Sequence, residues 1–124
     1  MNLPSQNEKE VVFENVIPPQ DFTLENQERT ITDVEDIDIE ECLEDMFVSQ
    51  EQFVILTAPE TQYKVRYIQA CMQGEDVDVE LGVEEEGTRL FYKICTKEEC
   101  YRIFLDFFDK TFKPDMDEYK PLEF

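Results

Sequence analysis

Residues 77–95, VDVELGVEEEGTRLFYKIC, decide the fold of this chain. Apolar residues occupy every second position from 77 to 83, and Asp78, Glu80 and Glu84 stand between or after them. This period of two is typical of a β-strand with one buried face and one face in water. The second half is rich in aromatic and aliphatic residues, and Gly87 provides the positive φ that a tight hairpin turn needs. The stretch therefore predicts two antiparallel strands.

Two earlier runs extend this hairpin into a larger sheet. QFVILTA at residues 52–58 is apolar on both faces, which is typical of an interior strand, and YKVRYIQACM follows at residues 63–72. Pro59 and residues 60–62 are expected to form the turn between them, and Gly74 precedes the next strand. The four runs predict a four-stranded antiparallel meander.

The segment TKEECYRIFLDFF, residues 96–108, predicts a helix that covers this sheet. Thr96 and Glu99 form a capping-box pattern at its start. An apolar stripe with helical spacing follows, made of Cys100, Ile103, Phe104, Phe107 and Phe108. We expect the helix near residues 97–112, before Pro114, with its stripe buried on one face of the sheet.

A second helix is expected near residues 38–49, within DIEECLEDMFVSQ. Asp38 is predicted to cap it, and Glu41 completes a capping-box pattern. Nine carboxylates and no Lys or Arg lie between Asp33 and Glu51, so the exposed side of this helix is predicted to be acidic. Its apolar face has the spacing i, i+3, i+4, i+7, i+8, at Ile39, Cys42, Leu43, Met46 and Phe47.

Together these patterns predict an α+β fold: a four-stranded antiparallel meander covered on one face by a C-terminal helix, with an acidic N-terminal helix and an extended arm. Residues 1–30 are expected to form the arm, extended or partly ordered, with a short strand at residues 10–17. Residues 31–124 are expected to form a single domain, because the chain has apolar material for one core.

On the uncovered face of the sheet, Lys64 and Arg66 are expected to lie opposite Asp78 and Glu80 of the neighbouring strand. The C-terminal tail from residue 113 is expected to pack loosely through Tyr119 or Phe124, or to remain mobile.

The composition restricts the function more than it identifies one. The chain has 31 acidic and 11 basic residues, a formal charge of −20, and no histidine. This surplus disfavours direct binding to DNA, RNA or an anionic membrane, because phosphate contacts normally need Lys or Arg. The chain shows no signal-peptide pattern and no apolar run of membrane-spanning length, so we expect a cytoplasmic protein that does not enter a membrane.

The sequence also lacks the usual groups for catalysis. Without histidine it has no Ser-His or Cys-His pair, and Gly74, Gly82 and Gly87 form no phosphate-binding loop. The acidic run at residues 33–40 lacks the glycine and final glutamate of a calcium loop. We expect no enzymatic activity, no metal and no cofactor, and we expect buried thiols at Cys42, Cys71, Cys95 and Cys100.

The acidic segments are the candidate functional residues. A charged surface often serves only solubility, but a polyanionic patch also directs association with a basic protein. On this second interpretation the oligomeric state stays open, and the predicted partner-binding residues are Asp36, Asp38, Glu40, Glu41, Glu44 and Asp45 on the acidic helix, with Glu84, Glu85 and Glu86 at the hairpin tip.

The order of VDVELGVEEEGTRLFYKI and TKEECYRIFLDFF resembles the strand, turn, strand and terminal helix of several families of small acidic immunity proteins, which protect bacteria from polymorphic or contact-dependent toxins. The resemblance covers about half of the chain, excludes the acidic segment before Glu51 and implies a cytosolic protein that blocks a toxin stoichiometrically. It implies no particular binding residues. Two alternatives stay open: a phage-type DNA mimic that inhibits a nucleic-acid-binding defence protein, and a carboxylate-based hydrolase.

Overall fold

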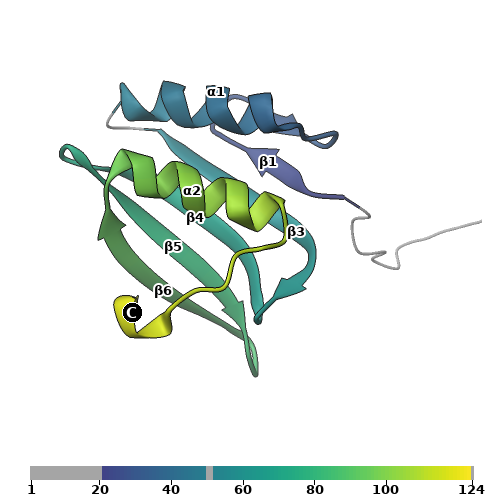
Figure 1. The fold of residues 1–124 in the computed structure, drawn as a ribbon, viewed down its shortest axis with the longest axis vertical. Coiled ribbons are helices and arrows are strands. Elements are labelled where there is room, and N and C mark those ends of the chain that lie inside the picture. Colours follow the sequence, from purple (N-terminus) through teal and green to yellow (C-terminus); the bar gives the residue numbers. More distant parts are fainter. Residues whose placement is uncertain (1–20, 50–51, 124) are drawn as a thin grey trace, which may run out of the picture.

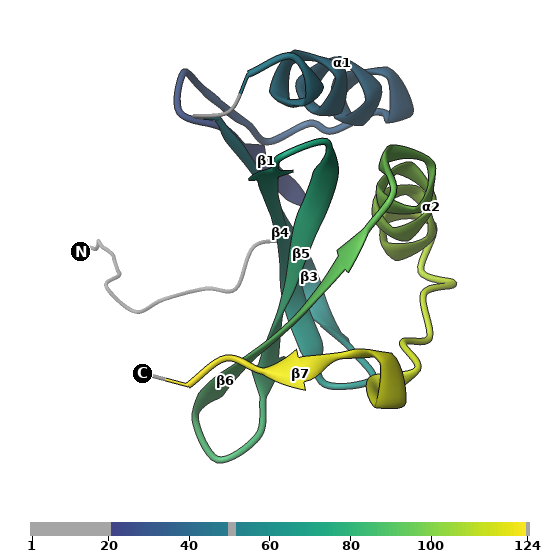
Figure 2. The same cartoon turned by 90° about the vertical axis from the view of Figure 1, so that its left-hand side faces the viewer.

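The four predicted strands form the centre of a wider sheet in the computed structural model, which describes residues 21–49 and 52–123. Two helices lie on one side of this sheet (Figures 1 and 2). The strands are β1 (Thr23–Glu25), β2 (Thr30–Ile31), β3 (Phe53–Gln62), β4 (Val65–Gln73), β5 (Asp76–Glu84), β6 (Thr88–Cys95) and β7 (Lys120–Pro121). The helices are α1 (Asp36–Phe47), α2 (Lys97–Phe108) and the 3-10 turn η1 (Met116–Glu118).

The predicted meander corresponds to β3, β4, β5 and β6, each antiparallel to the next, so the α+β class and the antiparallel sheet are confirmed. The strand count was wrong: the described sheet has seven strands in the order β2-β1-β3-β4-β5-β6-β7. The additional strands contain only two or three residues each, too few for a period of two to be visible in the sequence. The strand predicted at residues 10–17 lies outside the described residues.

The turn between β3 and β4 differs from the prediction. Pro59 to Gln62 belong to β3, and the turn consists of Tyr63 and Lys64, with φ of 51° and 71°. The regular pairing of β3 with β4 is interrupted between Thr57 and Gln62, which accommodates a proline that has no N–H to donate. Two successive positive φ values are typical of a type I′ hairpin turn.

Helix α2 follows the prediction at its start. The Thr96 hydroxyl oxygen accepts a hydrogen bond from the Glu99 backbone N–H at 3.1 Å. The helix ends at Phe108 rather than near residue 112, because Asp109 is its C-cap and Lys110 has a φ of 64°, in the left-handed region. Four residues of the predicted stripe are buried: Cys100, Ile103, Phe104 and Phe107.

Helix α1 begins earlier than predicted. Its N-cap is Glu35, and the Asp38 carboxylate, predicted as the cap, accepts a hydrogen bond from the Glu35 backbone N–H at 2.8 Å. Several neighbouring acids are suited to this role, so the sequence leaves the first residue ambiguous. Four residues of the predicted apolar face are buried, Ile39, Cys42, Leu43 and Met46, and the fifth, Phe47, is half-buried against the core.

The core lies between the two helices and the face of the sheet that they cover. Every second residue of β5, from Val77 to Leu81, is fully buried there, as are Phe104 and Phe107 of α2. The tail also joins the core, since Tyr119 is only 6% exposed, while Phe124 lies outside the described residues. Cys42, Cys95 and Cys100 are buried free thiols and Cys71 is half-buried.

Both helices contain twelve residues, and in the described part of the chain no helix is long and apolar enough to cross a membrane. The uncovered face of the sheet shows one close approach of two strands. Gly82 of β5 lies under the ring of Tyr67 on β4, where an added Cβ atom would come within 2.1 Å of the tyrosine Cε2 atom. A glycine is therefore required at this position by the neighbouring ring.

We predict that replacing the β3–β4 turn by Asn-Gly, through Tyr63→Asn and Lys64→Gly, raises the free energy of unfolding by about 1 to 2 kcal/mol, because these residues adopt left-handed φ at low cost. Urea unfolding should show a higher midpoint with an unchanged m-value. The two single variants distinguish the effect of the turn conformation from the loss of side-chain contacts. Lys64 pairs with Glu85, and the Lys113 ammonium lies 5.8 Å from the Tyr63 ring centroid. A lower midpoint in both single variants would contradict the assigned turn.

Candidate functional site

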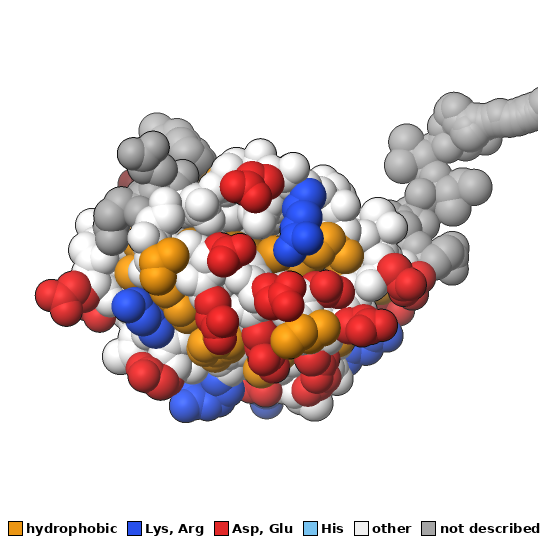
Figure 3. Space-filling view, turned by 90° about the horizontal axis from the view of Figure 1, so that it is seen from above, with side chains coloured by type: hydrophobic (Ala, Val, Ile, Leu, Met, Phe, Trp, Pro, Cys, Tyr) orange, Lys and Arg blue, Asp and Glu red, His pale blue; other side chains and the backbone are white. Residues whose placement is uncertain are grey.

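The predicted acidic residues of α1 do not form a uniform surface. Asp36, Glu41, Glu44 and Asp45 are exposed, whereas Asp38 and Glu40 are half-buried. Figure 3 looks onto this end of the molecule, where acidic side chains outnumber basic ones. The contacts made by each carboxylate decide which of them remain available to a partner.

Two of these six residues, Asp38 and Glu44, make contacts that serve the fold. Asp38 binds the backbone at the start of α1. The hydroxyl of Tyr101 on α2 donates a hydrogen bond to Glu44 Oε2 at 2.9 Å and so links the two helices. Burial, together with this hydrogen bond and the nearby charges of Glu44 and Glu40, raises the pKa of Tyr101 to about 12. Glu40 is half-buried, and its charge is close enough to Tyr101 to contribute to this shift.

The other three carboxylates, Asp36, Glu41 and Asp45, make no hydrogen bond or ion pair among the described residues. Two apolar side chains accompany them, since Ile37 is 51% exposed and Val48 is 86% exposed. Ile37 and Glu41, at the spacing i, i+4, lie on the side of α1 opposite the buried stripe, and Val48 is the C-cap residue at the end of the helix. We call these five residues, which lie on the exposed sides of α1 and at its C-cap, the α1 outer surface.

The hairpin tip is largely neutralised within the chain. Glu84 pairs with Arg66 at 3.2 Å and Glu85 pairs with Lys64 at 2.5 Å. The hydrogen bond and the charge of Lys64 lower the pKa of the Glu85 carboxyl. Glu86 is exposed and has no ion pair in the described part of the chain.

These pairs correct the expectation that Lys64 and Arg66 lie opposite Asp78 and Glu80. A bulge shifts the register between Val65 and Tyr67, and both bases bind carboxylates beyond the end of the regular pairing. The hairpin tip and α1 lie at opposite ends of the sheet in both ribbon views (Figures 1 and 2). The two groups of predicted partner-binding residues therefore belong to separate surfaces.

Asp78 and Glu80 were not predicted as site residues, yet their surroundings are unusual. Both are half-buried on the uncovered face of the sheet, where Asp78 lies between Cys71 and Ile94, and Glu80 lies between Gln69 and Tyr92. Burial raises the pKa of the Asp78 carboxyl, and burial together with the charge of Asp78 raises the pKa of Glu80. The Asp78 Oδ1 atom is buried without a hydrogen-bond partner.

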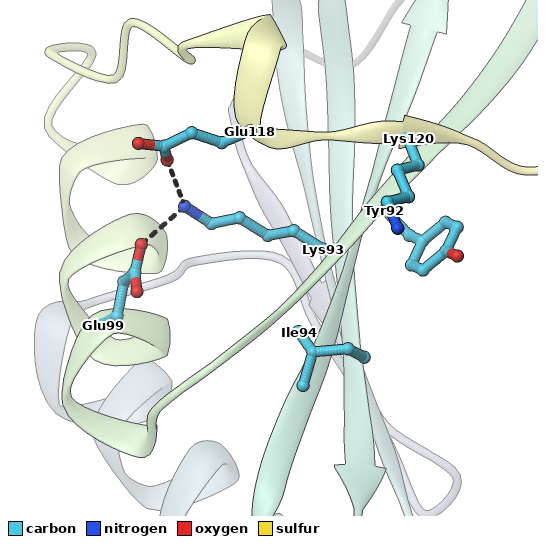
Figure 4. Close-up of a pocket in the computed structure, with 6 residues that line it drawn as sticks. All are labelled: Tyr92, Lys93, Ile94, Glu99, Glu118 and Lys120. Atoms are coloured by element: carbon cyan, nitrogen blue, oxygen red, sulfur yellow. Dashed lines mark hydrogen bonds and ion pairs between the residues drawn. The ribbon is translucent and has the colours of Figure 1, made fainter.

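A groove of about 520 Å³ lies beside β6 (Figure 4). In it the Lys93 ammonium binds Glu99 of α2 at 2.5 Å and Glu118 of η1 at 2.7 Å. It also lies 5.0 Å from the ring centroid of Tyr119. Burial disfavours the charged amine, but the hydrogen bonds to Glu118 and Glu99 outweigh burial and raise the pKa of Lys93. This cation therefore holds the C-terminal tail against α2.

Comparisons with protein-family models, with curated proteins and with solved structures found no match to this chain. Within the described residues, no group of three or more cysteine or carboxylate side chains is arranged to hold a metal ion. The candidate sites therefore rest on the geometry and the charges of the chain itself.

We predict that Lys93→Met lowers the free energy of unfolding by about 1 to 2 kcal/mol, because Glu99 and Glu118 lose the cation that joins them. Urea unfolding measures this loss. Hydrogen exchange should accelerate at the Leu122 amide, which donates to the Leu90 carbonyl beside β7. Lys120→Met removes an exposed charge from the same groove and should change neither quantity. Equal effects of both variants would contradict the assigned role of Lys93.

We predict that Asp78→Asn and Glu80→Gln each raise the free energy of unfolding at pH 7 by roughly 0.5 to 1 kcal/mol, a small gain because both side chains keep partial access to solvent. A carboxyl whose pKa is raised by folding destabilises the fold when ionised, and this cost disappears below its ordinary pKa. The gain should therefore shrink as the pH falls from 7 to 3. Thermal unfolding across this range tests it, and Asp76→Asn, at an exposed position of the same strand, should show no gain.

Proposed function

We propose that this protein is a stoichiometric, non-catalytic inhibitor that binds a basic protein, and that its partner is a bacterial toxin which it neutralises in the cytoplasm as an immunity protein. The observation that carries the proposal is the α1 outer surface, where Asp36, Glu41 and Asp45 have no partner among the described residues. The resemblance of the C-terminal half to acidic immunity proteins supports the choice of partner.

The distribution of basic residues supports the same proposal. Lys64, Arg66 and Lys93 are bound to carboxylates of the chain, so part of the small basic content is used within the fold. The excess negative charge is therefore not neutralised within the chain, and its electric field extends into the surrounding solvent. A field of this sign accelerates encounter with a cationic surface and loses its effect as salt screens it.

The combination of acidic and apolar groups on α1 also suits a protein partner. Ile37 lies one turn before Glu41 on the outside of the helix, and Val48 is exposed at its C-cap. Apolar side chains contribute affinity when they are buried, whereas charges mainly provide specificity and fast association. A purely solubilising surface needs no exposed isoleucine or valine between its charges.

The test is isolation of the partner from the source organism, followed by titration of the purified pair. We predict a basic protein bound one to one, with an affinity that falls as NaCl rises from 50 to 300 mM. The triple variant Asp36→Lys, Glu41→Lys, Asp45→Lys should bind about 10- to 100-fold more weakly and show a weaker dependence on salt, because it replaces attractive pairs by repulsive ones. Toxin activity should be restored when this variant replaces the wild type.

The matched control reverses three exposed acids away from α1, through Glu60→Lys, Asp117→Lys and Glu123→Lys. It changes the net charge by the same amount, so it should slow association but leave most of the affinity. Equal loss in both variants would show that only net charge matters and would reject the α1 outer surface. If duplex DNA competes with this protein for one groove of the partner, the DNA-mimic alternative replaces toxin immunity.

A further inference from the structure

The uncovered face of the sheet carries both half-buried carboxylates and half-buried apolar side chains. Both helices lie on the other side of the sheet (Figure 2). Asp78 and Glu80 occupy the middle of the uncovered face on β5. Half-buried apolar side chains lie on the same face. Those on the adjacent strands are Tyr67 and Cys71 of β4 and Leu90 and Tyr92 of β6, and one strand further away are Phe53 and Ile55 of β3.

The two carboxylates have no basic partner within the described residues. Arg66, at one end of this face, is bound to Glu84 and to the Pro59 carbonyl. Lys120 of β7 is paired in register with Tyr92, two strands away from Glu80, and makes no ion pair in the described part of the chain. Asp78 Oδ1 is removed from solvent without a hydrogen bond. Such an atom costs free energy that a cationic donor from outside the chain would recover.

We propose that this face is a docking surface for a basic protein segment in which two arginine or lysine side chains lie between apolar ones. Asp78 and Glu80 are two residues apart on one strand, so their side chains leave the same face about 7 Å from each other. An extended segment that carries cations at alternate positions matches this spacing. The flanking apolar side chain beyond Glu80 would then contact the Tyr67 ring, which covers Gly82 two residues further along β5.

The inference shares one premise with the proposed function, a basic protein as the partner, but it rests on a different surface. Asp78 and Glu80 lie on the face of the sheet away from the helices, because the residues that alternate with them on β5 are buried in the core, and neither belongs to the α1 outer surface. Desolvated carboxylates without a partner weaken the isolated fold. Their presence is explained if a ligand supplies the missing hydrogen bonds and the opposite charge, since binding sites often tolerate such a cost in stability.

The probe is the synthetic peptide Leu-Ser-Arg-Ser-Arg-Ser-Leu, which in an extended conformation presents two arginines between two leucines on one side. Titration of the ¹⁵N-labelled full chain at low salt and pH 7 should shift amide signals of β3 to β6. In the double variant Asp78→Asn, Glu80→Gln the peptide should bind at least tenfold more weakly. The matched variant Glu41→Gln, Asp45→Asn removes the same charge from α1 and should change the affinity less than twofold.

A second peptide of the same composition, Ser-Leu-Arg-Ser-Arg-Leu-Ser, places both leucines on the other side and should bind at least fivefold more weakly. Equal binding of the two peptides, equal loss in the two variants, or shifts centred on α1 would overturn the proposal. The double variant should also unfold at a higher temperature than the wild type. If it fails to fold or is less stable, Asp78 and Glu80 serve the fold and the proposal is wrong.

Two other occupants would also overturn the proposal. Concentration-dependent dimerisation that protects β3 to β6 would assign the face to a second copy of the chain, and nuclear Overhauser contacts from residues 1–20 would assign it to the chain itself. The outcome is separable from that of the proposed function. Loss of toxin binding in the α1 triple variant, with no peptide binding at the sheet, would reject only the docking surface on the sheet. Peptide binding at the sheet, with toxin binding unchanged in the α1 triple variant, would reject only the α1 outer surface.

Discussion

The packing of α1 and α2 on a single face of the sheet is the constraint on which the rest of the molecule depends. Leu43 and Met46 of α1, and Phe104 and Phe107 of α2, are all fully buried against that face. Each large apolar side chain that is removed from water contributes about 1.5 to 3 kcal/mol before conformational entropy is counted. Because one face receives both helices, the acidic residues lie outside this core, on the exposed sides of the helices, at the ends of the hairpins, in the C-terminal tail and on the uncovered face.

The scarcity of basic residues makes each ion pair informative. Arg66 and Lys64 bind the hairpin tip, and Lys93 binds α2 to the C-terminal tail. Lys93 is the most buried of the three, with a side chain 12% exposed, and its two carboxylates come from segments that are distant in sequence. These contacts explain why some conspicuous glutamates are poor candidates for recognition while less conspicuous ones remain available.

Much of the fold was predictable because its central elements are long and periodic. The alternation in β5 and the stripe of α2 each extend over nearly ten residues, and Thr96 caps α2 as its position indicated. Strands β1, β2 and β7 were missed because they exist only through pairing, of β1 with β3, of β2 with β1 and of β7 with β6. Pro59 was assigned to a turn because the sequence does not show where the pairing of β3 is interrupted.

The candidate sites were predictable only as regions of charge. The sequence identifies the acids of α1, but the hydrogen bond from Tyr101 to Glu44 joins residues 57 positions apart and depends on the packing of two helices. The environment of Asp78 depends in the same way on its cross-strand neighbours, Cys71 and Ile94. The run of apolar residues on both faces of β3 was the one available signal that the uncovered face is not simply solvated.

The contact between Tyr67 and Gly82 has a consequence for how this chain can diverge. Any side chain larger than hydrogen at position 82 would enter the space of the aromatic ring, and a smaller residue at position 67 would leave the glycine backbone uncovered. A substitution at either position is therefore tolerated best when the other changes with it. Among relatives that keep this sheet, the two positions should covary as a small residue paired with a large one.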